Sequence, residues 1–284
     1  MLVDLKKLVQ HAQKNNYCLG AFNIHNIESI KGIVEAASKL KSPAIIQASE
    51  SSVKYFGVKS IVCLVNEIIL TYGASIPFTL HLDHGNDIDL IKACINSGFK
   101  SVHIDASAYP LKENIKITKK IVNYAKGKNV WVQGEVGMIM GSHGKVSKKI
   151  GVVPLANCED VVRFAKETNV NTVAAAIGTA HGSFDDEKVS FDLLKAIKKD
   201  LRIPFVMHGG SGVPDRDIRK AIKMGVNIIN VGTDIKVAFT QSVIKASLKN
   251  SKETDPRILF ASAKDDIKKV VEKKMKLFAS SGQF

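Results

Sequence analysis

Short runs rich in β-branched residues alternate with longer segments of helical period along the whole 284-residue chain. The runs that we expect to form strands are eight and lie at 17–23, 43–49, 77–83, 101–105, 130–135, 172–178, 204–209 and 227–232. Helical periods occupy segments between them such as 27–40, 87–97, 113–126, 156–167 and 213–224. Such βα alternation predicts a parallel sheet, and eight units close a TIM barrel. We therefore predict an α/β fold: a single (β/α)8 TIM-barrel domain over residues 1–284, with an extra C-terminal helix at 257–278.

The composition is typical of a water-soluble globular protein. Hydrophobic residues make up 45% of the chain and charged residues 24%, and no apolar stretch reaches the roughly 18 residues that a membrane-spanning helix needs. Acidic and polar residues follow the first methionine too closely for a signal peptide. The four cysteines are widely separated and form no CxxC pair, which favours neither disulfides nor a cysteine-ligated zinc. We expect a cytoplasmic protein with no membrane partner.

The net charge of +14 raises nucleic acid as a partner. However, five of the 41 basic residues are arginines and the other 36 are lysines, spread along the expected helices without interleaved aromatic residues. This distribution favours a solvated lysine-rich surface, so we expect no nucleic-acid partner. The excess positive charge would also attract phosphorylated metabolites.

Polar side chains stand at the end of nearly every expected strand. In a barrel the carboxyl ends of all strands meet on one face, where active sites are built. A buried polar group without a partner costs about 1–3 kcal/mol, so a purely structural barrel has little reason to place so many there. The residues at these ends are Asn23, Gln47, Ser49, Asp83, His84, Asp105, Glu135, His181, His208 and Asn230. We predict that they converge on one functional site.

Three of these residues, His84, His181 and His208, follow separate strands, and each is followed by glycine. A lone histidine at a strand end is more often a hydrogen-bonded structural residue. Three imidazoles that leave coordination positions open describe a catalytic divalent metal site, most naturally zinc. The glycines let the backbone approach a metal-bound ligand closely. The pattern therefore predicts a three-histidine metal site.

Two glycine-bearing loops follow the last two expected strands, "HGGSG" at 208–212 and "NVGTD" at 230–234. The first of them precedes a helix, and backbone N–H groups aimed from a helix N-terminus suit a phosphate. Each loop alone is equally consistent with a tight βα turn. Together, after strands seven and eight, they match the usual phosphate site of a barrel.

At this point the ordered motifs resemble a known family, the class II, metal-dependent ketose-bisphosphate aldolases, which include fructose- and tagatose-bisphosphate aldolases. The resemblance runs over essentially the whole chain. The motifs that carry it are "AFNIHN" (21–26), "LHLDHG" (80–85), "IDAS" (104–107), "GEVG" (134–137), "AIGTAHG" (176–182), "MHGGSG" (207–212), "INVGTD" (229–234) and "DPR" (255–257).

The resemblance implies a carbon–carbon lyase of carbohydrate metabolism that cleaves a phosphorylated ketose to dihydroxyacetone phosphate and an aldehyde. Fructose 1,6-bisphosphate, which would release glyceraldehyde 3-phosphate, is favoured because it is the commonest substrate among relatives. "FNIHN" and "AIGTAHG" resemble tagatose-bisphosphate aldolases, while the ending "KMKLFASSGQF" resembles aldolases for a phosphorylated deoxy-keto-gluconate. Cleavage beside the ketose carbonyl leaves an enediolate, which a chelated zinc ion can stabilise without a Schiff-base lysine.

The resemblance also implies roles for individual residues. His84, His181 and His208 would hold Zn²⁺, and Asp83 would handle the proton of the aldehyde-derived hydroxyl. Glu135 and Asp105 match positions of an alternative or second divalent metal. Relatives also imply a nearby monovalent cation, Na⁺ or K⁺, and a homodimer or homotetramer. The residues expected to bind substrate, most of them around its phosphate, are Asn23, Ser49, Gly182, Gly209, Gly210, Ser211, Asn230, Val231, Gly232, Thr233 and Asp234.

The sequence departs from the family in the loop at 138–151, where His143 stands in place of the glutamate that acts as base on dihydroxyacetone phosphate. Imidazole is a competent general base near neutral pH. The alternative is a solvated His143 in a weak aldolase, in an enzyme for another substrate, or in a catalytically impaired barrel that only binds a sugar phosphate.

His103 stands where relatives have an apolar residue, and we expect it to pack inside the barrel rather than join the site. The C-terminal "SSGQF" lacks a basic residue that could bind a second phosphate. The lysines at 145, 148 and 149 could bind that phosphate instead, or they could be a solvated charged run.

Overall fold

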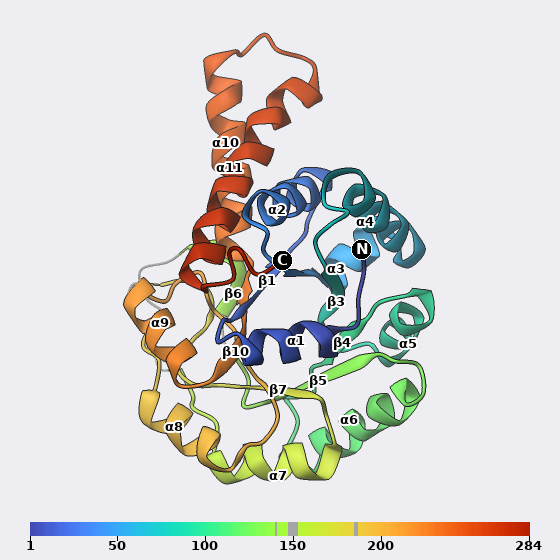
Figure 1. The fold of residues 1–284 in the computed structure, drawn as a ribbon, viewed down its shortest axis with the longest axis vertical. Coiled ribbons are helices and arrows are strands. Elements are labelled where there is room, and N and C mark those ends of the chain that lie inside the picture. The colour runs from blue at the N-terminus through green and yellow to red at the C-terminus, as the bar shows by residue number, and fades with distance from the viewer. Residues whose placement is uncertain (140, 147–152, 185–186) are drawn as a thin grey trace.

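The computed structural model describes residues 1–284 except 140, 147–152 and 185–186, and the side chains of 141–146 and 183 are also outside its description. Within the described residues, eight parallel strands close into a barrel in the order β1-β10-β9-β7-β5-β4-β3-β2 (Figure 1). These strands are β1 (Leu19–Asn23), β2 (Ala44–Ser49), β3 (Phe78–Gly85), β4 (Ser101–Ile104), β5 (Trp131–Val136), β7 (Thr172–Ala175), β9 (Phe205–Met207) and β10 (Val226–Val231). The predicted TIM barrel is confirmed.

Helices surround the barrel and extend beyond it. They are α1 (Leu5–Lys14), α2 (Ile27–Leu40), α3 (Glu50–Phe56), α4 (Val58–Tyr72), α5 (Ile88–Ser97), α6 (Leu111–Ala125), α7 (Cys158–Thr168), α8 (Phe191–Asp200), α9 (Asp215–Lys223), α10 (Thr233–Lys249) and α11 (Pro256–Leu277). Polar caps explain several of the starts. Asn26 and Ser29 form a capping box at α2, and Asp255 accepts the Arg257 N–H before Pro256 opens α11.

The buried apolar residues form a large cluster of strand and surrounding-helix residues and a smaller cluster at the amino-terminal end of the barrel. Helix α1 closes that end, and its buried Leu5, Leu8 and Val9 pack with Leu19 and Ile228 from the strands. Fully burying a side chain of this kind contributes about 1.5–3 kcal/mol. The polar strand ends lie at the opposite, carboxyl face, where they line a hollow.

Helices α10 and α11 form an antiparallel pair that projects away from the barrel (Figure 1). The barrel-proximal part of α11 packs on α2, with ion pairs from Lys264 and Lys268 to Glu35 and from Lys39 to Glu272. The expected C-terminal helix at 257–278 is thus confirmed, with the addition that α10 forms the other half of a projecting arm. We call residues 233–277 the arm.

A two-stranded parallel sheet accompanies the barrel, formed by β6 (Gly141–Val146) and β8 (His181–Ser183). Gly141 pairs with His181, and Val146 pairs with Ser183. This pairing brings part of the 138–151 loop beside the strand that carries His181. The sequence gives no sign of it, because a pairing of two very short segments depends on the loop's path and not on local pattern.

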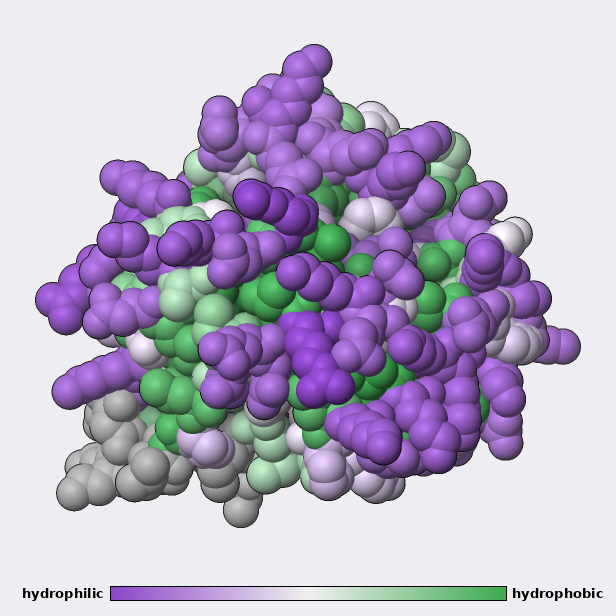
Figure 2. Space-filling view, turned by 90° about the horizontal axis from the view of Figure 1, so that it is seen from below, coloured by the Kyte–Doolittle hydropathy of each residue, from purple (hydrophilic) through white to green (hydrophobic). Residues whose placement is uncertain are grey.

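Hydrophilic residues cover much of the face of the molecule that lies opposite the arm (Figure 2). Figure 2, which views the molecule from the side opposite the arm, shows a hydrophilic face interrupted by small apolar areas. None of the helices in the described part of the chain is both long and apolar enough to cross a membrane.

Candidate metal centre and active site

The stretch "LDHG" ends β3 in an irregular conformation that aims His84. The pairing of β3 with β4 shifts register between Leu82 and Gly85, and His84 itself has a φ of 48°. A non-glycine residue in this left-handed region costs about 1–3 kcal/mol, which such sites tolerate when surrounding contacts hold them. The His84 N–H donates to His103 Nδ1 at 3.3 Å. A Cβ at Gly85 would lie 2.8 Å from the His103 carbonyl oxygen, so glycine is required beside it.

The three predicted histidines converge through one nitrogen each. His84 Nε2 lies 2.9 Å from His208 Nδ1, and His181 Nε2 lies 3.4 Å from the same atom. The rings of His84 and His181 have centroids 4.6 Å apart. In a tetrahedral zinc site with bonds of about 2.0–2.1 Å, ligand nitrogens are separated by about 3.3 Å. The donor set and its spacing therefore fit a zinc ion with one position left for another ligand.

Neighbouring groups set the tautomers that such an ion needs. His84 Nδ1 donates to Asp105 Oδ2 at 2.6 Å, which leaves Nε2 with its lone pair. Asn230 Nδ2 donates to His208 Nδ1 at 3.3 Å, so this nitrogen is an acceptor. The Gln133 amide nitrogen lies 3.2 Å from His208 Nε2, so the ring has a partner at each nitrogen, and Nδ1 is the one that faces the other two histidines.

The electrostatics of the centre favour a cation. Burial alone would lower the pKa of His84, but the carboxylates of Asp83, Asp105 and Glu135 raise it to about 10. Burial and the His84 charge lower the pKa of His208 well below its usual range, so this ring is neutral and able to ligate. Asp83 and Asp105, whose own pKa values are lowered, hold a proton on this imidazole in the metal-free protein. The same negative field attracts a divalent ion.

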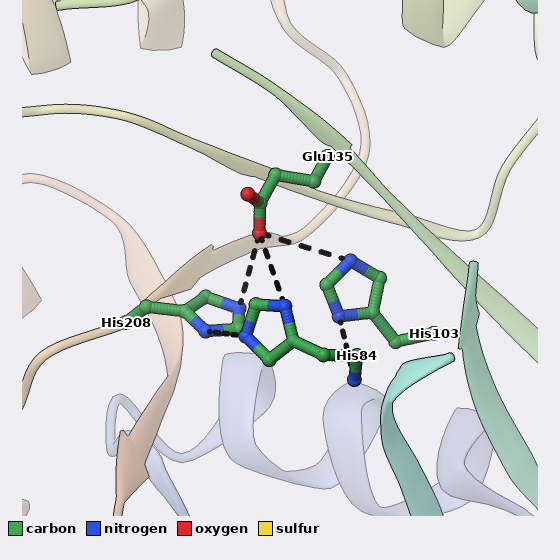
Figure 3. A group of neighbouring side chains, drawn as sticks. All are labelled: His84, His103, Glu135 and His208. Carbon is green, nitrogen blue, oxygen red and sulfur yellow. Dashed lines mark hydrogen bonds and ion pairs between the residues drawn. The ribbon is translucent and has the colours of Figure 1, made fainter. Parts of the chain in front are cut away.

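Two of these histidines, His84 and His208, also belong to a second group of ligand atoms, together with His103 and Glu135 (Figure 3). His84, His103, Glu135 and His208 each offer an atom within 4.8 Å of the others. Glu135 Oε2 is 3.8 Å from His103 Nε2 and 3.9 Å from His84 Nδ1, and neither it nor His103 Nε2 has a hydrogen-bond partner among the described residues. Burial, with the neighbouring Asp105 charge, raises the pKa of Glu135 to about 8. Of the two residues predicted for an alternative or second metal, Glu135 belongs to this buried group, whereas Asp105 contacts it through its hydrogen bond with His84.

His103 is fully buried inside the barrel, as the packing interpretation requires. It also contacts the centre directly, because its Nδ1 accepts the backbone N–H of His84. The two interpretations of this residue are therefore not exclusive in the structure.

Asp83 lies beside the centre and is held by two amides. Asn23 Nδ2 donates to its Oδ2 at 2.8 Å and Asn230 Nδ2 to its Oδ1 at 3.3 Å, while Gln47 donates to Asn23. Burial would raise the pKa of Asp83, but the His84 charge and the Asn23 hydrogen bond lower it to about 2. The carboxylate is therefore ionised and fixed in direction, with only 3% of the residue exposed.

The carboxyl face opens into a hollow whose empty volume, the open solvent at its entrance included, is about 590 Å³. The predicted residues that line it are Asn23, Ser49, Asp83, His181, Gly182, His208, Gly209, Ser211, Asn230, Gly232 and Thr233. The remaining predicted residues with described side chains are not part of this lining: His84, Asp105, Glu135, Gly210, Val231 and Asp234. His143 lies in β6, whose side chains are outside the described structure, as is Lys145; Lys148 and Lys149 are outside it altogether.

Three further residues line the hollow that sequence reasoning missed: His25, Ser51 and Lys236. Lys236 is near the N-terminus of α10, where a positive charge opposes the helix dipole. Burial lowers the pKa of its ammonium, against the opposing effect of Asp83. This unfavourable position of a lysine in the first turns of a helix is the one sequence signal that could have indicated a functional role for Lys236. Ser51 and His25 gave none, since they follow the strand ends in irregular or helical segments.

The two glycine loops pack tightly against each other and against the barrel. The Gly210 N–H donates to the Asn230 carbonyl at 3.0 Å, and the Asp234 N–H donates to Ser211 Oγ at 3.2 Å. Gly209 has a φ of 75°, and a Cβ there would lie 2.5 Å from the Ala180 carbonyl oxygen. The loops therefore form a fixed cradle at the N-terminal end of α10, as expected for a phosphate site.

Comparisons with known proteins agree along the whole chain. The family model described as fructose-bisphosphate aldolase class-II matches residues 3–283. A fructose-bisphosphate aldolase from Geobacillus stearothermophilus is 37% identical over 286 residues, covering 99% of this chain and 98% of the relative. A 6-phospho-5-dehydro-2-deoxy-D-gluconate aldolase from Halalkalibacterium halodurans is 37% identical over 285 residues, with coverages of 99% and 98%. The crystal structure of the YdjI aldolase from Escherichia coli K12 superposes with a TM-score of 0.83 at 26% identity, covering 100% of this chain and 99% of that one.

Proposed function

The chain belongs to the class II fructose-bisphosphate aldolase family and is therefore a metal-dependent aldolase, and we propose that it cleaves fructose 1,6-bisphosphate to dihydroxyacetone phosphate and glyceraldehyde 3-phosphate. The observation that carries the proposal is the convergence of three histidine nitrogens beside an ionised Asp83, at the mouth of a hollow flanked by two glycine loops. In this proposal His84, His181 and His208 hold Zn²⁺. A bound divalent ion would polarise the ketose carbonyl and stabilise the negative charge that develops on cleavage.

The protein's own groups account for proton transfer and orientation. Asp83, fixed by Asn23 and Asn230, takes the proton from the hydroxyl that becomes the aldehyde oxygen and returns it in the condensation direction. The loops at 208–212 and 230–234, with Gly182 and a monovalent cation, hold the phosphate of the dihydroxyacetone half. Asp105 orients His84, and Glu135 provides an alternative metal position.

Lys236 brings a positive charge to the hollow, which Ser49, Ser51 and His25 also line. A second anionic group on the substrate would be placed there. In fructose 1,6-bisphosphate this group is a phosphate. In 6-phospho-5-dehydro-2-deoxygluconate it is a carboxylate, and the equal identity to an aldolase of that name makes this compound the second candidate substrate.

His143 completes the proposal as the base that exchanges a proton with dihydroxyacetone phosphate, because β6 runs beside His181. His143→Ala is expected to abolish proton exchange while dihydroxyacetone phosphate still binds. Unchanged exchange in this variant would exclude His143 as the base.

The decisive experiment is a cleavage assay of zinc-loaded protein with fructose 1,6-bisphosphate, tagatose 1,6-bisphosphate and 6-phospho-5-dehydro-2-deoxygluconate, each with and without a chelator. We expect chelator-sensitive cleavage with the highest kcat/KM for fructose 1,6-bisphosphate. A higher kcat/KM for either other compound would reassign the substrate. No cleavage of any of them by folded, zinc-loaded protein would refute the proposal.

A further inference from the structure

Lys274, near the C-terminal end of α11, is buried although it carries an ammonium group. Only 7% of the residue is exposed, a rare position for lysine unless its charge is compensated. Its Nζ donates to the Gly210 carbonyl oxygen at 2.7 Å and pairs with Asp234 Oδ2 at 2.8 Å. Both are short, charge-assisted contacts. The lysine is therefore held in one place by two partners.

These two partners belong to the two glycine loops. Gly210 lies in the loop after β9, and Asp234 lies in the first turn of α10, after β10. Within the barrel the loops contact each other through the hydrogen bonds from Gly210 to Asn230 and from Asp234 to Ser211. Lys274 adds a connection from outside the barrel, from helix α11, 64 residues further along the chain than Gly210. It therefore links both loops to the arm.

The contact with Gly210 also orients the next peptide group. In a trans peptide the C=O and the following N–H point in opposite directions. The Gly210 carbonyl is turned to Lys274, so the Ser211 N–H is turned away from α11. Ser211 lines the hollow. In addition, the ammonium neutralises the Asp234 carboxylate, which would otherwise repel an anion at the adjacent helix N-terminus.

We propose that Lys274 is a positioning residue for a substrate phosphate: by holding the Gly210 carbonyl and the Asp234 carboxylate, it keeps the Ser211 N–H and the N-terminus of α10 directed at the phosphate. The inference rests on the proposed function, in which these loops bind dihydroxyacetone phosphate. Lys274 does not touch the reacting atoms, so its effect falls on affinity for the phosphorylated substrate more than on the chemical step.

The test compares Lys274→Met with Lys273→Met, which removes an exposed lysine at the next position of the same helix. The readout is the proton exchange of dihydroxyacetone phosphate with solvent, measured over a range of substrate concentrations by zinc-loaded protein. Lys274→Met is expected to raise KM at least tenfold and to change kcat less than threefold. Lys273→Met is expected to leave both values as in the wild type. Lys274→Gln, which keeps an N–H donor without the charge, is expected to raise KM by an intermediate factor.

Zinc content and thermal unfolding of the same preparations separate this role from a structural one. A KM within twofold of wild type in folded, zinc-loaded Lys274→Met overturns the inference. A fall in kcat in proportion to the folded fraction, at unchanged KM, overturns it equally, because that is the effect of a merely structural lysine. If the Met variant does not fold, the same criteria apply to Lys274→Gln. Absence of exchange in the wild type itself contradicts the proposed function, and the inference with it.

Discussion

At the residue scale, Asp83 is the group whose chemistry the structure defines most closely. Its pKa is lowered to about 2, so Asp83→Asn removes a negative charge at every working pH and leaves an amide of the same shape. Loss of a positioned acid–base group lowers kcat by about 10²–10⁴-fold, and we expect this loss in cleavage assays. The control is Asp89→Asn, an equal charge change at an exposed residue of the next helix, which should keep full activity. A kcat within threefold of wild type for Asp83→Asn would remove Asp83 from the mechanism.

His84 couples metal binding to pH. In the metal-free protein its pKa is raised to about 10. Protonation of His84 therefore stabilises the folded state. This contribution is complete below the unfolded-state pKa of about 6.5 and is lost as the pH rises through about 10. Zinc must displace that proton. We expect apparent zinc affinity to rise by about tenfold per pH unit between pH 6.5 and 8.5, with about one proton released, measured by titration calorimetry in buffers of different ionisation enthalpy. A pH-independent affinity without proton release would contradict this arrangement.

Which site residues the sequence could predict follows from where they stand. His84, His181 and His208 end strands or follow them directly, and strand ends of a barrel meet by geometry, so a count of strands was sufficient to bring them together. Lys236 and Ser51 stand in helices that follow the strands, and whether a helical residue faces the hollow depends on the helix direction. His103 shows the same limit within a strand, since alternation placed it inside the barrel without revealing that it accepts the His84 N–H.

At the scale of elements, the irregular end of β3 is the feature that presents the metal ligand. A Cβ at Gly85 would lie 2.8 Å from both the His103 carbonyl oxygen and Ile91 Cγ1. Gly85→Ala is therefore expected to lower the free energy of unfolding by about 1–3 kcal/mol and to weaken zinc binding, as measured by denaturant unfolding and chelator competition. Gly127→Ala serves as the control, because no heavy atom would lie within 4 Å of the new Cβ and its left-handed backbone accounts for any cost. Equal zinc affinity in the Gly85 and Gly127 variants would show that β3 tolerates the change.

The strands themselves were predicted to within a few residues, because a buried parallel strand is a short apolar run bounded by polar residues and glycine. The largest boundary difference is in β7, which ends at Ala175 although the apolar run continues to Gly178. Gly178 has a φ of 97°, outside the range of a strand, and residues 176–178 turn toward β8. The β6–β8 pair could not be predicted, because its partners lie in segments too short to carry a periodic pattern.

At the scale of the whole molecule, closure of the barrel follows from the number of βα units, whereas the projection of the arm does not. The periodicity of α11 predicts a helix but not its direction. The structure shows α10 and α11 paired with each other beyond the barrel (Figure 1), where they leave large apolar side chains exposed. Leu248 is 80% exposed, Ile258 58% and Ile244 54%. An element of this kind is typical of a subunit interface rather than of an isolated surface.

The expected homodimer or homotetramer therefore has a specific test in the arm. An apolar groove lies beside the hollow, lined in part by Ile27, Phe56 and Phe260, and an isologous arrangement would seat the arm of one copy on this face of another. The double variant Leu248→Asp, Ile258→Asp places two charges on the arm and should convert the oligomer to monomers in sedimentation velocity at micromolar concentration. Leu70→Asp, which alters a residue 61% exposed on α4, should leave the mass unchanged. A monomeric wild type, or an arm variant of unchanged mass, would exclude the arm as the interface.

Because Lys274 joins the base of the same arm to both glycine loops, dissociation is also expected to weaken dihydroxyacetone phosphate binding, so that assembly and substrate affinity change together.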